Sequence, residues 1–123
     1  MLTTLDFSPV RQFVTALERR DFETLQQALS DTVRFRALIP PGLREFEGAA
    51  DSRAVIERWF GDADVFEMEC SSIGSVGGRV QAHYRIRLRE RGEWSACEQQ
   101  LFADVELGKI VAIDLLCSGF VRL

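Results

Sequence analysis

Four residues with chemically useful side chains fall in the last third of the chain, within segments that otherwise alternate apolar and polar residues. Tyr84, Cys97, Gln99 and Asp114 supply a phenol, a thiol, an amide and a carboxylate. Polar groups on an apolar wall are costly unless they bind one another or a ligand. A carboxyl group in such a wall has a raised pKa and is able to act as a general base beside a carbonyl. The pattern predicts a binding pocket, with Asp114 as its candidate base.

Three long strands must position these four side chains. The expected strands are Arg79–Glu90, Glu93–Glu106 and Lys109–Cys117, joined by two-residue turns at 91–92 and 107–108. Because side chains alternate between the two faces of a strand, the first turn pairs Ile86 with Cys97 and Tyr84 with Gln99. These side chains are expected on the inner face, toward the helices.

The position of Asp114 depends on the register of the last turn. A regular two-residue turn pairs Asp114 with Leu101, on the inner face with Tyr84. A slip of one residue would instead place Asp114 on the outer face, beside His83 and Gln100. We expect the inward register.

Each inner candidate has a structural explanation beside the functional one. Asp114 either acts as a base or bonds Tyr84, Gln99 or a helix end and only stabilises the fold. Tyr84 and Gln99 either donate hydrogen bonds to a ligand oxygen or hold Asp114 in place. Cys97 has no inward His or Lys to form a thiolate, so it is expected as a small residue of the wall. Trp59 and Phe35 are expected to line the pocket, although core packing alone would also explain them.

The outer face of the same strands predicts an interface. Trp94, Phe102, Ile113 and Leu115 are expected to point outward there, between charged residues. An apolar patch with a polar rim is typical of protein–protein interfaces. We therefore expect a homodimer through this face, and a non-catalytic association module is the alternative to a ligand-binding protein. His83 is expected outward, as a surface or interface residue.

Helices and shorter strands precede the three long strands. Ser8 is expected to cap the first helix, with a proline following it, and Asp21 is expected to cap the second. The expected elements are helices at 8–20, 22–29 and 49–60 and strands at 33–38 and 65–73. The helix at 49–60 is expected to bury Ala54, and Cys70 is expected to share a face with Met68. This order predicts an α+β fold: a curved, cone-like, mostly antiparallel sheet with about three helices on its concave face.

Composition excludes several classes of function. With 123 residues, the chain is expected to form one domain over residues 1–123. Its net charge of −4 provides no basic field for nucleic acid or anionic lipid. Glutamates on neighbouring strands are expected to neutralise the stripe of arginines at 85, 87, 89 and 91. No apolar run approaches the ~20 residues that span a bilayer. The segment Met1 to Asp6 lacks an export signal, and three cysteines lack metal-ligand spacing, so we expect a cytoplasmic protein without metal or cofactor.

The element order resembles the nuclear transport factor 2-like superfamily. This superfamily includes ketosteroid isomerases, polyketide cyclases of the SnoaL-like group and limonene epoxide hydrolases. The resembling segments are residues 16–22, the helix of Leu25 and Leu29 running into Val33–Phe35, Gly48 before the Trp59 helix, and the turn at 107–110. The run Cys117–Phe120 resembles a bacterial subgroup. The resemblance implies a cone-shaped sheet that encloses an apolar pocket, commonly in a dimer.

The resemblance also implies which residues each known activity of the superfamily requires. Ketosteroid isomerases have an acid just after the first strand and a tyrosine in the first helix, where this chain has 37–39 and Phe13 or Leu17. Epoxide hydrolases of this fold need an Asp-Arg-Asp set around a water, and Asp114 is the one inward acid expected here. Polyketide cyclases often rely on one inward acid on a late strand, which Asp114 would supply. The leading expectation is a domain that binds a small apolar molecule bearing a carbonyl or hydroxyl, and that supports cofactor-free isomerisation, cyclisation or hydration.

Overall fold

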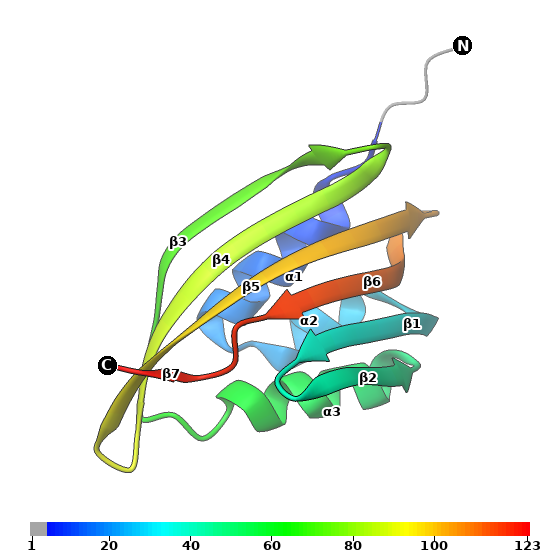
Figure 1. The fold of residues 1–123 in the computed structure, drawn as a ribbon. Helices are drawn as coiled ribbons and strands as arrows, with labels where there is room; N and C mark the ends of the chain where they lie inside the picture. The colour runs from blue at the N-terminus through cyan, green and yellow to red at the C-terminus, as the bar shows by residue number, and fades with distance from the viewer. Residues whose placement is uncertain (1–4) are drawn as a thin grey trace.

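Three helices lie against one face of a curved sheet in the computed structural model, which describes residues 5–123 (Figure 1). The helices are α1 (Ser8–Arg19), α2 (Phe22–Gln27) and α3 (Ala49–Phe60). The strands are β1 (Leu29–Ile39), β2 (Gly42–Glu47), β3 (Val65–Val76), β4 (Arg79–Glu90), β5 (Glu93–Glu106), β6 (Lys109–Cys117) and β7 (Val121–Arg122). The predicted α+β class is confirmed. The segment Met1 to Asp6, where no export signal is expected, lies mostly outside the described residues.

The sheet is mixed but mostly antiparallel. Its strand order is β2-β1-β6-β5-β4-β3, and β7 pairs with β5 beside this path. β1 and β6 run parallel, while the other neighbours run antiparallel. The three long strands have the predicted bounds, whereas β2 and β7 were not predicted. Within residues 5–123, no helix is long and apolar enough to cross a membrane.

The helix starts follow the sequence signals with one shift. Ser8 is the first residue of α1, and Phe7 occupies the cap position. The backbone N–H of Ser8 donates to Asp6 Oδ1 at 3.0 Å. The expectation that Ser8 caps α1 is therefore wrong by one residue. Asp21 does cap α2, accepting from the backbone N–H of Thr24 at 3.2 Å.

One arginine joins the ends of α1 and α3. Arg20 has a left-handed backbone (φ 52°), and its Nη1 donates to the carbonyls of Phe60 and Ala63 at 3.2 and 2.6 Å. Helix α3 has the predicted bounds, but it buries Ser52 and leaves Ala54 exposed. The expectation for Ala54 is wrong because its position turns toward solvent rather than toward the sheet.

The inner face of the sheet, which faces the helices, carries the core. The predicted register of β4 and β5 is confirmed, with Tyr84 opposite Gln99 and Ile86 opposite Cys97. The largest fully buried side chains are Tyr84, Phe13, Phe35, Phe60, Leu17, Leu25, Ile56, Ile86, Leu88, Leu101, Ile110 and Ile113. The core therefore lies between the helices and the middle of the sheet.

Two bulges change which residues face inward. In β3, Met68 pairs with Ile86 but Cys70 pairs with Arg85, so Cys70 is exposed on the outer face, contrary to expectation. In β6, Val111 is an extra residue between the partners of Asp104 and Val105. A bulge inserts one residue into one strand and reverses the faces beyond it. Every β6 side chain after Val111 therefore has the opposite orientation from the one predicted.

Glutamates on neighbouring strands neutralise two arginines of the outer face of β4, as predicted, whereas Arg89 pairs with Asp64 instead. Arg85 Nη1 lies 3.6 Å from Glu98 Oε1, and Arg87 Nη1 lies 3.7 Å from Glu67 Oε2. His83 also faces outward, with its Nε2 3.9 Å from Glu98 Oε2. These contacts leave no broad basic surface on this part of β4.

Candidate functional site

A cavity of about 430 Å³ lies where the end of β1, the end of α3 and the C-terminal segment meet. Its volume is in the range of small-molecule sites. The lining residues come from four segments of the chain: Ile39, Pro40, Trp59, Gln99, Cys117, Ser118, Gly119 and Phe120. Most of them are apolar, and Gln99 and Cys117 provide polar side chains on one side.

Aromatic rings form the apolar side of the cavity. Trp59 lines it directly, and Phe35 packs edge-on behind Trp59 with ring centroids 6.1 Å apart. Phe120 lines the cavity from the C-terminal segment and packs against Phe60 at 6.0 Å. Of the two expected aromatic lining residues, Trp59 therefore borders the space and Phe35 supports it.

A buried hydrogen-bond chain forms the polar side. Tyr84 Oη donates to Gln99 Oε1 at 2.5 Å, and Gln99 Nε2 donates to Cys117 Sγ at 3.3 Å. Burial raises the pKa of Tyr84 well above its usual value, so its hydroxyl stays protonated and donates. This bond fixes the orientation of the Gln99 amide, which turns its nitrogen toward the sulfur. Gln99 borders the cavity, whereas Tyr84 lies behind it.

The Cys117 sulfur has hydrogen-bond partners on three sides. Its neighbours are Cys97 Sγ at 3.6 Å, Gln99 Nε2 at 3.3 Å and the backbone N–H of Gly119 at 3.3 Å. The bond from the Cys97 thiol, helped by those from Gln99 and Gly119, lowers the pKa of Cys117 to about 6 against the opposing effect of burial. The same bond and burial raise the pKa of Cys97. The contact between the two sulfurs therefore favours the negative charge on Cys117 and the proton on Cys97.

The turn after β6 brings the third donor to the sulfur. Gly119 has a φ of 75°, a conformation that residues with a Cβ rarely adopt. A Cβ at this position would also lie 3.4 Å from Pro40 Cγ. Ser118 anchors the turn, since its Oγ accepts from the backbone N–H of Glu98 at 2.9 Å. Glycine at 119 thus permits the tight approach that places its amide on the Cys117 sulfur.

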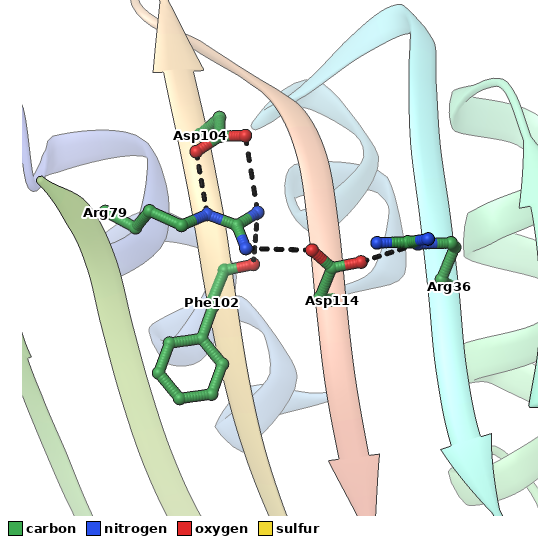
Figure 2. Close-up of polar contacts among 5 residues, drawn as sticks. All are labelled: Arg36, Arg79, Phe102, Asp104 and Asp114. Carbon is green, nitrogen blue, oxygen red and sulfur yellow. Dashed lines mark hydrogen bonds and ion pairs between the residues drawn. The ribbon is translucent and has the colours of Figure 1, made fainter. Parts of the chain in front are cut away.

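Asp114 does not belong to this cavity. The β6 bulge pairs Asp114 with Phe102 on the outer face, so the inward position expected for it is wrong. Figure 2 shows its carboxylate between two arginines: Arg36 Nε donates to Oδ1 at 2.7 Å and Arg79 Nη1 donates to Oδ2 at 2.8 Å. The bond from Arg36, joined by that from Arg79, lowers the pKa of Asp114 despite partial burial. Its pKa shift is therefore opposite to the one a buried general base needs.

An Asp-Arg-Asp arrangement does exist, but on the outer face. Arg79 donates from Nε to Asp104 Oδ1 at 2.8 Å and from Nη1 to Asp114 Oδ2, so it bridges the two acids (Figure 2). The helices lie behind the sheet in this view, on the side opposite the bridge. The arrangement therefore cannot hold a water in the inner cavity.

Because of the same bulge, two of the four residues expected at the interface are buried. Ile113 and Leu115 are 1% and 3% exposed on the inner face, so they are unavailable to a partner. Phe102 remains on the outer face, opposite Asp114. Trp94 lies under two guanidinium groups, with Arg87 Cζ 3.9 Å and Arg89 Cζ 5.6 Å from its ring centroid.

Sequence reasoning missed Cys117 and the segment that follows it. A regular β6 would have placed Cys117 outward, and the bulge turns it into the cavity. One signal in the sequence pointed to the observed register. A register that buries Ile113 and Leu115 has a lower free energy than one that buries the carboxylate of Asp114. Among residues 5–123, no group of three or more His, Cys, Asp or Glu side chains is placed to hold a metal ion.

Comparison with known proteins gives a family and a fold. Residues 10–113 match the SnoaL-like domain. No curated protein sequence matches the chain.

Several solved structures share the fold. An LEH-like epoxide hydrolase of M. tuberculosis superposes with a TM-score of 0.70 at 21% identity, over 91% of this chain and 81% of that one. A candidate polyketide cyclase of Xanthomonas campestris pv. campestris gives 0.72 at 17% identity, over 89% and 87%. A nuclear transport factor 2-like protein of Cytophaga hutchinsonii gives 0.62 at 21% identity, over 96% and 95%. These superpositions establish a common fold.

Proposed function

This chain belongs to the SnoaL-like domain family, and on that premise we propose that it binds a small apolar molecule in the cavity beside Trp59 and Cys117. Proteins with this fold include an LEH-like epoxide hydrolase and a candidate polyketide cyclase. The ligand proposed here is an apolar, ring-containing compound that bears a carbonyl or hydroxyl group.

The lining of the cavity carries this proposal. Trp59 and Phe120 offer aromatic surface to an apolar body, while Gln99 and Cys117 offer polar atoms to one end of it. Gln99 Nε2 has two hydrogens and uses one on Cys117, which leaves the other for a ligand oxygen. Apolar walls with a few oriented polar groups are the usual composition of small-molecule sites.

The chemistry available in the cavity differs from the expectation built on Asp114. Of the eight described residues that line the cavity, Cys117 is the one whose side chain loses a proton in the ordinary pH range of proteins. A thiolate with a lowered pKa is able to accept a proton at neutral pH. Cofactor-free isomerisation, cyclisation or hydration at this site would therefore use Cys117 as the base and Gln99 as the donor to the ligand oxygen.

Binding is tested by titrating 2-acetylnaphthalene, an aromatic ketone, into labelled protein and following amide signals by NMR. We expect shifts at the side-chain amide of Gln99 and the backbone N–H of Gly119, which border the cavity. Replacement of Trp59 by Leu (W59L) removes aromatic contact area and should raise Kd at least tenfold, by about 1.4 kcal/mol.

The other tryptophan provides the matched control. Trp94 lies on the outer face under Arg87, so W94L should leave Kd within about twofold of the wild-type value. Equal losses in both variants, or shifts confined to outer-face amides, would refute binding in this cavity. If the ketone exchanges its α-hydrogens for deuterium on the protein, C117S should abolish that exchange while W94L retains it.

We also propose that two copies associate through the outer face. Leu38 and Leu116 are paired neighbours there and are 49% and 47% exposed, next to Phe102 on β5. Adjacent exposed leucines are a specific reason to expect a partner surface. The charged residues around them match the polar rim of such interfaces.

A further inference from the structure

We propose that Cys117 and Cys97 form an oxidation site, in which a hydroperoxide converts the two thiols into a disulfide. The two sulfurs lie 3.6 Å apart on the inner face, one at the edge of the cavity and the other in the core. This inference needs no bound ligand, so its test is independent of the binding proposal.

Cys117 is the thiol that meets the oxidant. It borders the cavity and is partly exposed, so a small peroxide reaches its sulfur. The amide of Gln99, the backbone N–H of Gly119 and the thiol of Cys97 all point at this sulfur, and each stabilises a negative charge on it. Thiolates are the nucleophilic form of cysteine, and hydrogen-bond donors around the sulfur raise their population. The lowered pKa of Cys117 agrees with this geometry.

Cys97 is placed to act second. It is fully buried, so solvent reaches it poorly, and its sulfur contacts that of Cys117. A buried thiol that keeps its proton is a poor first nucleophile, but it is in position to attack an oxidised sulfur beside it.

The reaction balances with the peroxide as the oxidant. The Cys117 thiolate attacks one peroxide oxygen, the O–O bond breaks, and the leaving alkoxide takes a proton, which yields a sulfenic acid on Cys117 and an alcohol. The Cys97 sulfur then attacks the Cys117 sulfur, and hydroxide leaves with the Cys97 proton as water. Two thiols and one hydroperoxide thus give one disulfide, one alcohol and one water. An external dithiol reverses the change.

Closure of the bond requires a small movement of the strands. Cys117 pairs with Gln99, and Cys97 lies two residues along β5 on the same face, so the two cysteines are diagonal neighbours. A disulfide has an S–S distance of about 2.05 Å, so the sulfurs must approach by roughly 1.5 Å. β6 ends at Cys117, and the chain turns two residues later at Gly119, so the shift falls at the end of a strand.

The experiment treats the reduced protein with one equivalent of hydrogen peroxide, followed by intact mass spectrometry and peptide mapping without reductant. We expect a product lighter by two hydrogen atoms, with the Cys97 and Cys117 peptides joined and Cys70 still alkylated by iodoacetamide. The C70S variant should behave identically, because Cys70 lies exposed on the outer face. At pH 6.5, iodoacetamide should also alkylate Cys117 about tenfold faster than Cys70.

The roles of the two sulfurs are separated by single variants. In C97S, and in C97A if serine disturbs the core, dimedone should trap a sulfenic acid on Cys117. In C117S, dimedone should label neither residue 97 nor residue 117. Retention of all three thiols in folded wild-type protein, or disulfides formed only between chains through Cys70, would overturn the proposal. Dimedone adducts on Cys97 in C117S would reverse the assigned order and overturn it as well.

Discussion

At the scale of the residue, Asp114 shows how its partners determine the chemistry of a carboxylate. Arg36 and Arg79 each donate to one of its oxygens, and Arg79 also binds Asp104 (Figure 2). The arrangement links β1, β6, β5 and the start of β4 across the outer face. Because Asp114 pairs with both arginines, we assign it a role in stability.

Substitution of Asp114 by Asn should therefore destabilise the protein in a pH-dependent way. Two partly exposed ion pairs contribute about 1 kcal/mol together, and their loss also leaves Arg36 and Arg79 facing each other. Because folding lowers the pKa of Asp114, its contribution is complete above the unfolded value of about 3.9 and disappears as the pH falls through the folded value. The difference in unfolding free energy between wild type and D114N should be about 1 kcal/mol at pH 7 and should become smaller as the pH falls below about 3.9.

Urea denaturation at pH 7 and pH 2 measures this difference. D104N is the matched control, since Asp104 binds one of the two arginines and should cost less at pH 7. A D114N deficit that stays constant between pH 7 and pH 2 would contradict an electrostatic role.

The candidate site was only partly predictable at this scale. The pairing of Tyr84 with Gln99 follows from a two-residue turn, whose geometry fixes the register of the strands it joins. The orientation of Asp114 does not follow from its turn, because the bulge at Val111 lies beyond the turn and reverses the faces. No residue type marks that bulge, so the position of Cys117 in the cavity could not be derived from the turn alone.

At the scale of the element, the contact between the ends of α1 and α3 positions the wall that carries Trp59. Arg20 leaves α1 with a left-handed backbone and reaches the carbonyls of Phe60 and Ala63 at the end of α3. Its guanidinium also lies 5.1 Å from the ring centroid of Phe66 on β3. These contacts satisfy carbonyls that a helix end leaves without partners.

The R20M variant should lower the unfolding free energy by about 1–2 kcal/mol, because two partly buried carbonyls lose their donor. Methionine keeps a similar stem, so the change isolates the guanidinium. R19M is the control, since Arg19 is an exposed neighbour in the last turn of α1. Thermal denaturation compares the variants, and equal melting temperatures for R20M and R19M would exclude this role for Arg20.

Elements with a sustained pattern were predicted with their bounds, whereas the expected helix at 22–29 ends at Gln27, and β1 begins at Leu29 rather than at residue 33. Helix α3 and strands β4, β5 and β6 have the predicted bounds because each carries a sustained periodic pattern. β2 is a six-residue strand whose side chains are mostly exposed, so it has no clear alternation to detect. β7 has two exposed residues, and it forms because the turn at Gly119 returns the chain to β5.

At the scale of the whole molecule, the outer face divides into distinct regions. The Asp104–Arg79–Asp114–Arg36 bridge occupies its middle, and Leu38 and Leu116 form an apolar pair next to it. A partner copy seated over the leucines would bury apolar surface while the bridge remains at the rim. This placement favours association along β1 and β6 rather than at Trp94.

The proposed self-association predicts a concentration-dependent dimer that a single charge disrupts. L116R places an unpaired cation in the apolar pair, so the variant should be monomeric at micromolar concentrations at which the wild type is dimeric. The unfolding free energy of the monomer should change by less than about 0.5 kcal/mol. L107R is the control, because Leu107 is fully exposed at the tip of the β5–β6 turn. Sedimentation velocity resolves the two species. A wild-type protein that stays monomeric at hundreds of micromolar would rule out the dimer.

The C-terminal segment has a further consequence for how this protein evolves. Every buried residue of the described hydrophobic core lies between Val10 and Leu115, whereas Ser118, Gly119 and Phe120 border the cavity from outside that core. Phe120 is 49% exposed, so its replacement alters the shape of the cavity without opening a void in the packed interior. Selection for a new ligand is thus able to act on one short segment while the stability of the fold stays nearly constant.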